Sequence, residues 1–170
     1  MANKLLIQPT EVGALARECN AEEDIVIRAI EESEMNDIRP ALGDGVFSAV
    51  KANPTKYNTL LNGGEYEARG CVKVFAGLKT ALAYYVWARL AKTSPYHITR
   101  FGFVVKGDDY SRQPEWSERQ AIYNDAYAIA DGYIRDCAEY VKDTPSLFGS
   151  LLGSNDERNT TRSFTRIIGC

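Results

Sequence analysis

The sequence predicts a mainly α-helical protein: a bundle of about four to five helices, a short extended segment near residues 98–106 and an extended C-terminal arm. Its 170 residues fit one domain better than two, and 45% apolar with 25% charged residues is ordinary globular composition. Apolar residues recur at helical spacing over much of residues 11–142, but the period breaks near residues 92–116 and after residue 143. We therefore expect a helical domain over residues 1–143 and an arm over residues 144–170.

The first part of the chain predicts two helices joined by a short link. Residues 11–19 form a short amphipathic segment. Asn20 is a residue type typical of an N-cap, with Glu23 three positions later, and acidic residues fill the following turn. Pro40 disturbs the end of this second helix and Gly43 ends it.

The middle of the chain predicts two short helices and then a long one. Residues 46–62 carry two small apolar groups on either side of Pro54. Asn62-Gly63-Gly64 predicts a turn. The strongest helical pattern covers residues 74–91, where few positions are polar, so we expect this helix at the centre of the bundle.

Residues 92–116 interrupt the helical period with a run of aromatic and β-branched residues that predicts extended structure. Ser117 and Gln120 then have the spacing of a capping box, which predicts a last long helix over residues 118–142. Two neighbouring apolar stripes follow this helix, so it should contact more than one neighbour.

The residues after Asp143 change in character. Residues 144–153 contain Pro and Gly, and residues 154–161 are polar. Residues 163–168, SFTRII, have the pattern of a short strand. Such a tail is typical of an arm that docks elsewhere, for instance by adding a strand to a partner. A tail folded back onto its own domain fits these residues equally well.

Composition and charge exclude several classes of protein. The net charge of −3 argues against a basic nucleic-acid-binding surface, and no apolar run is long enough to cross a bilayer. Residues 1–7 carry too few basic and apolar residues for a signal peptide. Residues 1–45 hold a net charge of −6, residues 46–143 one of +2 and residues 144–170 one of +1. An acidic first third and a mildly basic remainder could complement each other between subunits.

No motif indicates catalysis, a cofactor or a metal site. His97 is the single histidine and no CxxC occurs, so the zinc ligand sets of known motifs are missing. We expect reduced cysteines, with Cys19 and Cys137 buried. The acidic residues are expected on solvated surfaces: those of residues 22–34, and Asp125, Asp131 and Asp136 on the polar side of the last helix.

Tyrosine is unusually frequent, with ten Tyr against six Phe and two Trp. Tyr side chains suit subunit contacts because they combine apolar area with a hydroxyl group. We expect a protein interface to use some of Tyr84, Tyr96, Tyr110, Tyr123 and Tyr127; the alternative is an amphipathic rim of the monomer core.

The order of elements resembles the head–tail connector (adaptor, or collar-ring) proteins of tailed bacteriophages, with collar-ring proteins that include those of crAss-like phages as the nearer match. The resemblance covers roughly residues 8–142 and rests on IRPALG at 38–43, GLKTALAYYVWARL at 77–90, FGFVVK at 101–106 and the closing Tyr-rich helix. It implies a structural virion protein without enzymatic activity or cofactor. Such proteins form a ring, usually twelvefold, beneath the portal, which joins capsid to tail and continues the DNA channel.

The resemblance also implies partners and contact residues. The partners would be further copies of the chain, the portal protein and neighbouring collar or tail proteins, with genomic DNA passing through the lumen without sequence-specific binding and without any membrane. Assembly would take place in the host cytoplasm. Subunit or portal contacts are expected at Ile98, Phe101, Phe103, Val104, Tyr110 and Trp116, and in the arm at Leu147, Phe148, Phe164, Ile167 and Ile168.

Two other functions remain open at the level of sequence. One is a stand-alone helical protein-binding or regulatory module with a flexible tail. The other is a small helical enzyme, which would require a buried pocket lined by at least two carboxylates.

Overall fold

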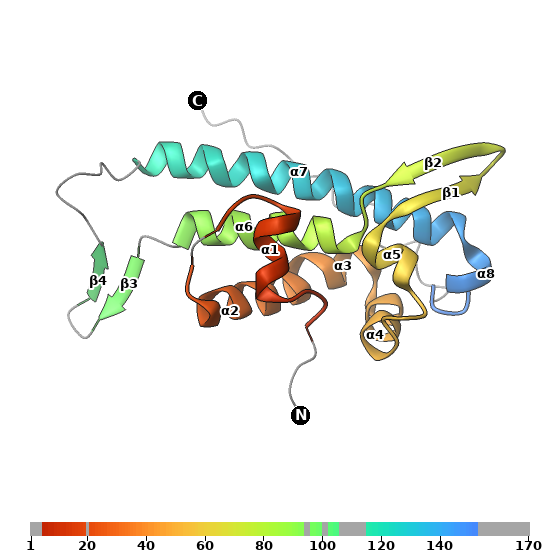
Figure 1. Ribbon diagram of the computed structural model, residues 1–170, viewed down its shortest axis with the longest axis horizontal. Coiled ribbons are helices and arrows are strands. Elements are labelled where there is room, and N and C mark those ends of the chain that lie inside the picture. The colour runs from red at the N-terminus through yellow and green to blue at the C-terminus, as the bar shows by residue number, and fades with distance from the viewer. Residues whose placement is uncertain (1–4, 20, 94–95, 100–101, 106–114, 153–170) are drawn as a thin grey trace.

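A computed structural model describes residues 5–19, 21–93, 96–99, 102–105 and 115–152 and confirms a mainly helical fold with short β segments (Figure 1). The elements follow the order α1 (Pro9–Leu15), α2 (Glu23–Ser33), the π-helix η1 (Glu34–Ile38), α3 (Arg39–Leu42), α4 (Asp44–Ala52), α5 (Asn58–Asn62), β1 (Gly64–Ala68), β2 (Cys71–Phe75), α6 (Leu78–Thr93), β3 (Tyr96–Thr99), β4 (Gly102–Val105), α7 (Trp116–Asp143) and α8 (Pro145–Phe148).

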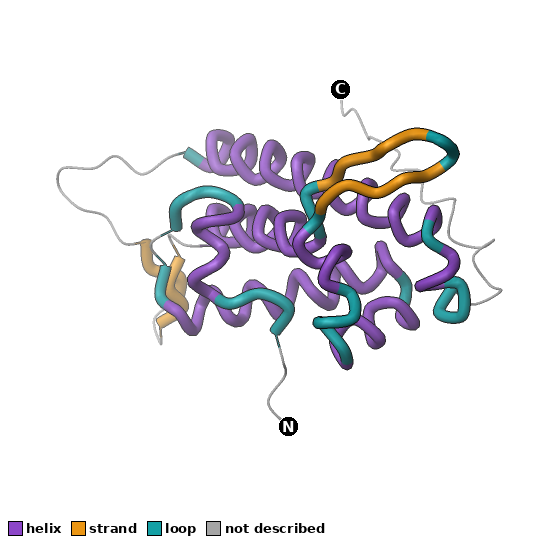
Figure 2. The backbone as a smooth tube through the Cα atoms, turned by 45° about the vertical axis from the view of Figure 1, so that its right-hand side comes forward, coloured by secondary structure: helices purple, strands orange, loops and turns teal. Residues whose placement is uncertain are grey.

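Helix α6 lies at the centre of the bundle, as its apolar composition predicts. It packs along α7 on one side and contacts α1, α2 and α5 elsewhere. Leu78, Leu82 and Val86 are completely buried along it, which removes their apolar surface from water. Figure 2 shows α6 and α7 running side by side over most of the length of the molecule.

The second predicted helix continues through three segments, α2, η1 and α3. Its described N-cap is Glu22, whereas Asn20 lies outside the described residues. Pro40 lies in the last turn, and Gly43 adopts φ +83°, a left-handed value that ends the helix with little strain for glycine. The π-helical turn was not predicted from the sequence.

A β-hairpin, β1–β2, precedes α6, where the sequence pattern predicted only a turn followed by helix from Val74. The strands pair antiparallel from Gly64↔Phe75 to Ala68↔Cys71. Arg69 and Gly70 form the turn, both at positive φ. Gly77, at φ +89°, lies so close to Gly63 that a side chain at residue 77 would collide with the Gly63 backbone. Because β2 extends through Phe75, α6 begins at Leu78 instead of Val74.

A second antiparallel hairpin, β3–β4, forms the extended segment expected near residues 98–106. Helix α7 then begins at Trp116, and Glu115 with Glu118 forms the capping box that was predicted for Ser117 and Gln120. Both views place the two hairpins at opposite ends of the α6–α7 pair (Figures 1 and 2).

The boundary predicted after Asp143 does not mark the end of the core. Helix α8 packs against α7, and the Phe148 side chain is completely buried. Its ring stacks on Tyr57 with centroids 5.4 Å apart, so this part of the predicted arm folds back onto its own domain. None of the helices described is both long and apolar enough to cross a membrane.

Candidate functional site

The predicted contact residues do not form one site. Trp116 is exposed over 57% of its surface at the start of α7, but Phe148 is buried in the core and Leu147 is half-buried against it. Phe148 is therefore unsuited to contact another subunit in this conformation, which corrects that expectation. Ile98 lies on β3, and Phe103 and Val104 lie on β4, where only the backbone is described. Outside the described residues lie Phe101, Tyr110, Phe164, Ile167 and Ile168.

The β1–β2 hairpin carries a surface that the sequence did not predict. Val72 and Val74 are 69% and 71% exposed, far more than the valines of the core. They pair across the strands with Glu67 and Glu65, which are also exposed. These four side chains share one side of the hairpin because alternate residues of a strand face the same way. We call Glu65, Glu67, Val72 and Val74 the outward face.

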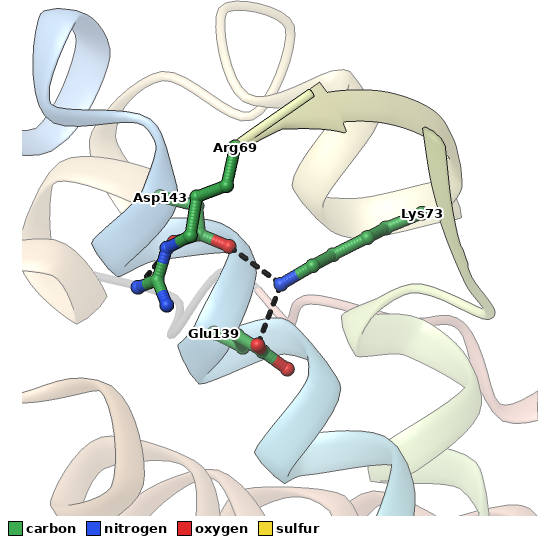
Figure 3. A network of polar contacts seen from close by, with 4 residues as sticks. All are labelled: Arg69, Lys73, Glu139 and Asp143. Atoms are coloured by element: carbon green, nitrogen blue, oxygen red, sulfur yellow. Dashed lines mark hydrogen bonds and ion pairs between the residues drawn. The ribbon is translucent and has the colours of Figure 1, made fainter. Parts of the chain in front are cut away.

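The opposite side of the hairpin is tied to α7 by charged side chains (Figure 3). The Lys73 ammonium group donates to Glu139 Oε1 at 2.6 Å and to Asp143 Oδ2 at 2.8 Å. Arg69 adds a contact to Asp143 Oδ1 at 3.2 Å. The hydrogen bonds to Asp143 and Glu139 raise the pKa of Lys73, and the bond from Lys73 lowers the pKa of Asp143. This arrangement fixes which side of the hairpin faces outward.

Aromatic rings fill the space between the hairpin, α7 and α8. Tyr140 of α7 contacts Tyr66 edge-on at 4.9 Å and stacks on Phe75 at 4.7 Å. On another side it meets Phe148 of α8, with centroids 5.9 Å apart. The hairpin and α8, the last described helix, therefore both pack against the Tyr140 ring.

A second cluster of polar groups lies where η1 meets α6 and α7. Asp37 Oδ2 accepts a hydrogen bond from Arg89 at 2.7 Å, and its Oδ1 accepts one from the Tyr127 hydroxyl at 2.7 Å. Arg89 also donates to Ser33 Oγ at 3.0 Å. Burial opposes the charge of Arg89, but the hydrogen bond with Asp37 raises the pKa of the guanidinium group overall.

Tyr85 extends this cluster by donating to Asp131 Oδ1 at 2.5 Å. Burial and this hydrogen bond raise the pKa of the Tyr85 hydroxyl, and burial with the bond to Asp37 raises that of Tyr127. Both hydroxyls thus remain protonated donors. Asp131 is half-buried and engaged in the interior, which corrects its expected place on the polar side of α7.

Glu34 also departs from its expected solvated position, because its side chain is completely buried. It accepts a hydrogen bond from the Leu6 backbone N–H at 2.6 Å and forms an ion pair with Lys51. Glu34 and Asp37 both lie in the π-helical turn, which directs the two carboxylates into the protein. The sequence contains one indication that Asp37 points inward. Ser33 follows Ile30 on the apolar stripe, and Asp37 follows Ser33 by one helical turn.

These polar groups are arranged to hold helices together. The acceptor atoms named above are each engaged by a donor of the same chain, which is the usual state of buried polar groups. Among the residues described, no group of three or more His, Cys, Asp or Glu side chains is placed to hold a metal ion. Cys137 is buried as expected, whereas Cys19 is only half-buried and Cys71 is exposed.

Comparison with known proteins gives a family. Residues 38–161 match the family DUF6712, described as a family of unknown function. The chain belongs to this family. The match begins within η1 and includes both hairpins, α6, α7 and α8. Neither the curated proteins nor the solved structures gave a match.

Proposed function

We propose that this DUF6712 member is a structural subunit of the ring beneath the portal of a tailed bacteriophage, where it joins the capsid to the tail and continues the DNA channel. The observation that carries the proposal is the placement of two different hairpins at opposite ends of the α6–α7 pair (Figure 1). A head-to-tail ring requires two different surfaces on each subunit, because each copy contacts its neighbours through unlike faces.

The chemistry of the outward face supports a protein contact. Val72 and Val74 place apolar area on a projecting hairpin, and Glu65 and Glu67 border it with charge. An apolar centre with a polar border is typical of protein interfaces. The two-stranded sheet is also short, so each of its edges offers a limited place for another strand.

The exposed charges of α2 are compatible with a channel through which DNA slides. Glu22, Glu23, Asp24 and Glu32 are exposed on or beside this helix. Lysine and arginine contacts with phosphates would hold a duplex in place, whereas an acidic wall would not. The proposed location is the virion, with further copies of the chain, the portal and neighbouring tail proteins as partners.

The test is mass photometry and negative-stain imaging of the purified full chain, alone and mixed with a candidate portal protein. Rings of about a dozen subunits, or decoration of the tail-side face of the portal, are expected from the closed symmetry of such assemblies. A chain that remains monomeric and ignores the portal would overturn the proposal in favour of a stand-alone binding module.

A pair of matched variants assigns the contact surface. Val72→Lys places a charge on the outward face, and Met35→Lys does the same on η1, where Met35 is 45% exposed. Val72→Lys should abolish assembly and Met35→Lys should leave it intact. Equal assembly by both variants would remove the β1–β2 hairpin from the interface.

A further inference from the structure

The outward face of the β1–β2 hairpin has a pattern that specifies what can cover it. Along β1 it presents two carboxylates, Glu65 and Glu67, and along β2 two isopropyl groups, Val74 and Val72. Charge and apolar area thus lie in parallel rows. A segment that covers this face needs apolar side chains and two positive charges at strand spacing.

The end of this chain has the complementary pattern. Arg162, Phe164, Arg166 and Ile168 alternate with Ser163, Thr165 and Ile167. In an extended segment the first four side chains share one face, because the side-chain period of a strand is two. That face carries two guanidinium groups and two apolar groups, which match the two carboxylates and two valines of the hairpin in kind and number.

The described structure brings the start of the tail to the same end of the molecule as the hairpin. Phe148 of α8 meets Tyr140, and Tyr140 meets Tyr66 of β1, at 5.9 Å and 4.9 Å between centroids. Leu151 and Leu152 pack against the core directly after α8. Residues 153–161 then separate this point from Arg162, and nine extended residues span roughly 30 Å.

We propose that the outward face of the β1–β2 hairpin is a docking site for residues 162–168 of the same chain in the free protein. A short tether keeps the effective concentration of the tail high, so docking within one copy is favoured over docking to another. The arginines pair with Glu65 and Glu67 while Phe164 and Ile168 cover Val72 and Val74. The backbone of the tail hydrogen-bonds to one free edge of the hairpin, and its long side chains extend from that edge over the outward face.

Because of this docking, the outward face is accessible only when the tail is displaced. A partner that binds the hairpin has to displace the tail, so the free protein hides its exposed valines until that partner is present. The docking itself does not depend on a ring or a portal. If the ring proposed above is the partner, the tail is what keeps free copies apart.

Hydrogen exchange with mass spectrometry on the full chain, at about 1 µM, tests the docking. Amides of residues 163–168 should exchange at least tenfold more slowly than an unstructured peptide of the same sequence. Glu65→Lys with Glu67→Lys should remove this protection, and adding Arg162→Glu with Arg166→Glu should restore it. The matched control, Glu18→Lys with Asp24→Lys, makes the same change in net charge on exposed residues away from the hairpin and should leave the tail protected.

Three results would overturn the proposal. They are unprotected tail amides in the wild-type chain, tail protection that ignores the Glu65 and Glu67 reversals, and protection that is present at 50 µM but absent at 1 µM. The last would assign the tail to a neighbouring copy. Protection of residues 64–75 shows whether the hairpin is intact in each variant. The double variant Val72→Thr with Val74→Thr removes apolar area from the outward face but keeps strand propensity, and it provides a second test of tail protection.

Discussion

Glu34 is a buried carboxylate on which two distant parts of the chain depend. It accepts the Leu6 N–H, which fixes the first described residues onto the bundle, and it pairs with Lys51 of α4. We expect Glu34→Ala to lower the free energy of unfolding by about 3 kcal/mol, because the Leu6 N–H loses its acceptor and a buried ion pair is broken. Glu34→Gln retains an acceptor and should cost about half as much.

Urea unfolding of the two variants measures the difference. Glu32→Ala is the matched control, since Glu32 is two residues away with its side chain 62% exposed, and it should change stability by no more than about 0.5 kcal/mol. Equal stability of Glu34→Ala and Glu32→Ala would contradict a structural role for Glu34.

Burial also separates the cysteines by reactivity. Burial, followed by the charge of Asp136, raises the pKa of the Cys137 thiol to about 12. The thiol therefore stays protonated in the folded chain at pH 8.5, and iodoacetamide should modify exposed Cys71 but not Cys137. Because the unfolded thiol ionises near pH 9, this group stabilises the fold below pH 9 and loses that contribution as pH rises towards 12. Peptide mass spectrometry reads the labelling, and equal labelling of both cysteines would contradict the buried position.

At the scale of elements, the β1–β2 hairpin depends on α7 for its orientation. We expect Lys73→Met to increase amide exchange in residues 64–75 roughly tenfold while leaving that of α6 unchanged, since local opening frees only the hairpin. The hydrogen bond from Lys73 lowers the pKa of Asp143, so the contact persists above the ordinary value of 3.8 and is lost as pH falls through the lowered pKa. Lys142→Met, an exposed lysine at the same end of α7, is the control. Unchanged exchange in Lys73→Met would show that the aromatic contacts alone hold the hairpin.

Helices were predicted from the sequence more successfully than the structure around the hairpin. Residues 78–93 and 116–143 bury regular stripes, so apolar period alone identifies them. The β1–β2 hairpin escaped prediction because Glu65, Glu67 and Lys73 interrupt its apolar residues, and its role depends on α7 residues about 70 positions later. The π-helical turn that contains the buried Glu34 and Asp37 could not be predicted, because π-helical turns are rare and apolar periodicity does not identify them. Trp116 is exposed, as expected of a contact residue, whereas the exposure of the valines of the outward face was not predicted from the sequence.

At the scale of the whole molecule, the position of Phe148 decides where the folded domain ends. A chain that stops after Asp143 lacks this ring, which is completely buried against Tyr57 and Tyr140. We expect that truncation to lower the free energy of unfolding by about 3–5 kcal/mol, the usual cost of removing a buried Phe side chain. A chain that stops after Leu152 keeps all of α8 and should lose only about 1–2 kcal/mol, the contribution of a docked tail whose amides exchange roughly tenfold more slowly.

Urea unfolding of the two truncated chains, beside full-length Phe148→Ala, separates the buried ring from the rest of the tail. Phe148→Ala should reproduce most of the loss seen after truncation at Asp143, because the cavity it leaves lies in the core shared by α5, α7 and α8. If both truncations were equally stable, α8 would be a dispensable cover, and the arm would begin at Thr144. If only the shorter chain unfolds easily, the domain extends through α8, and only residues beyond Leu152 are available to act as an arm.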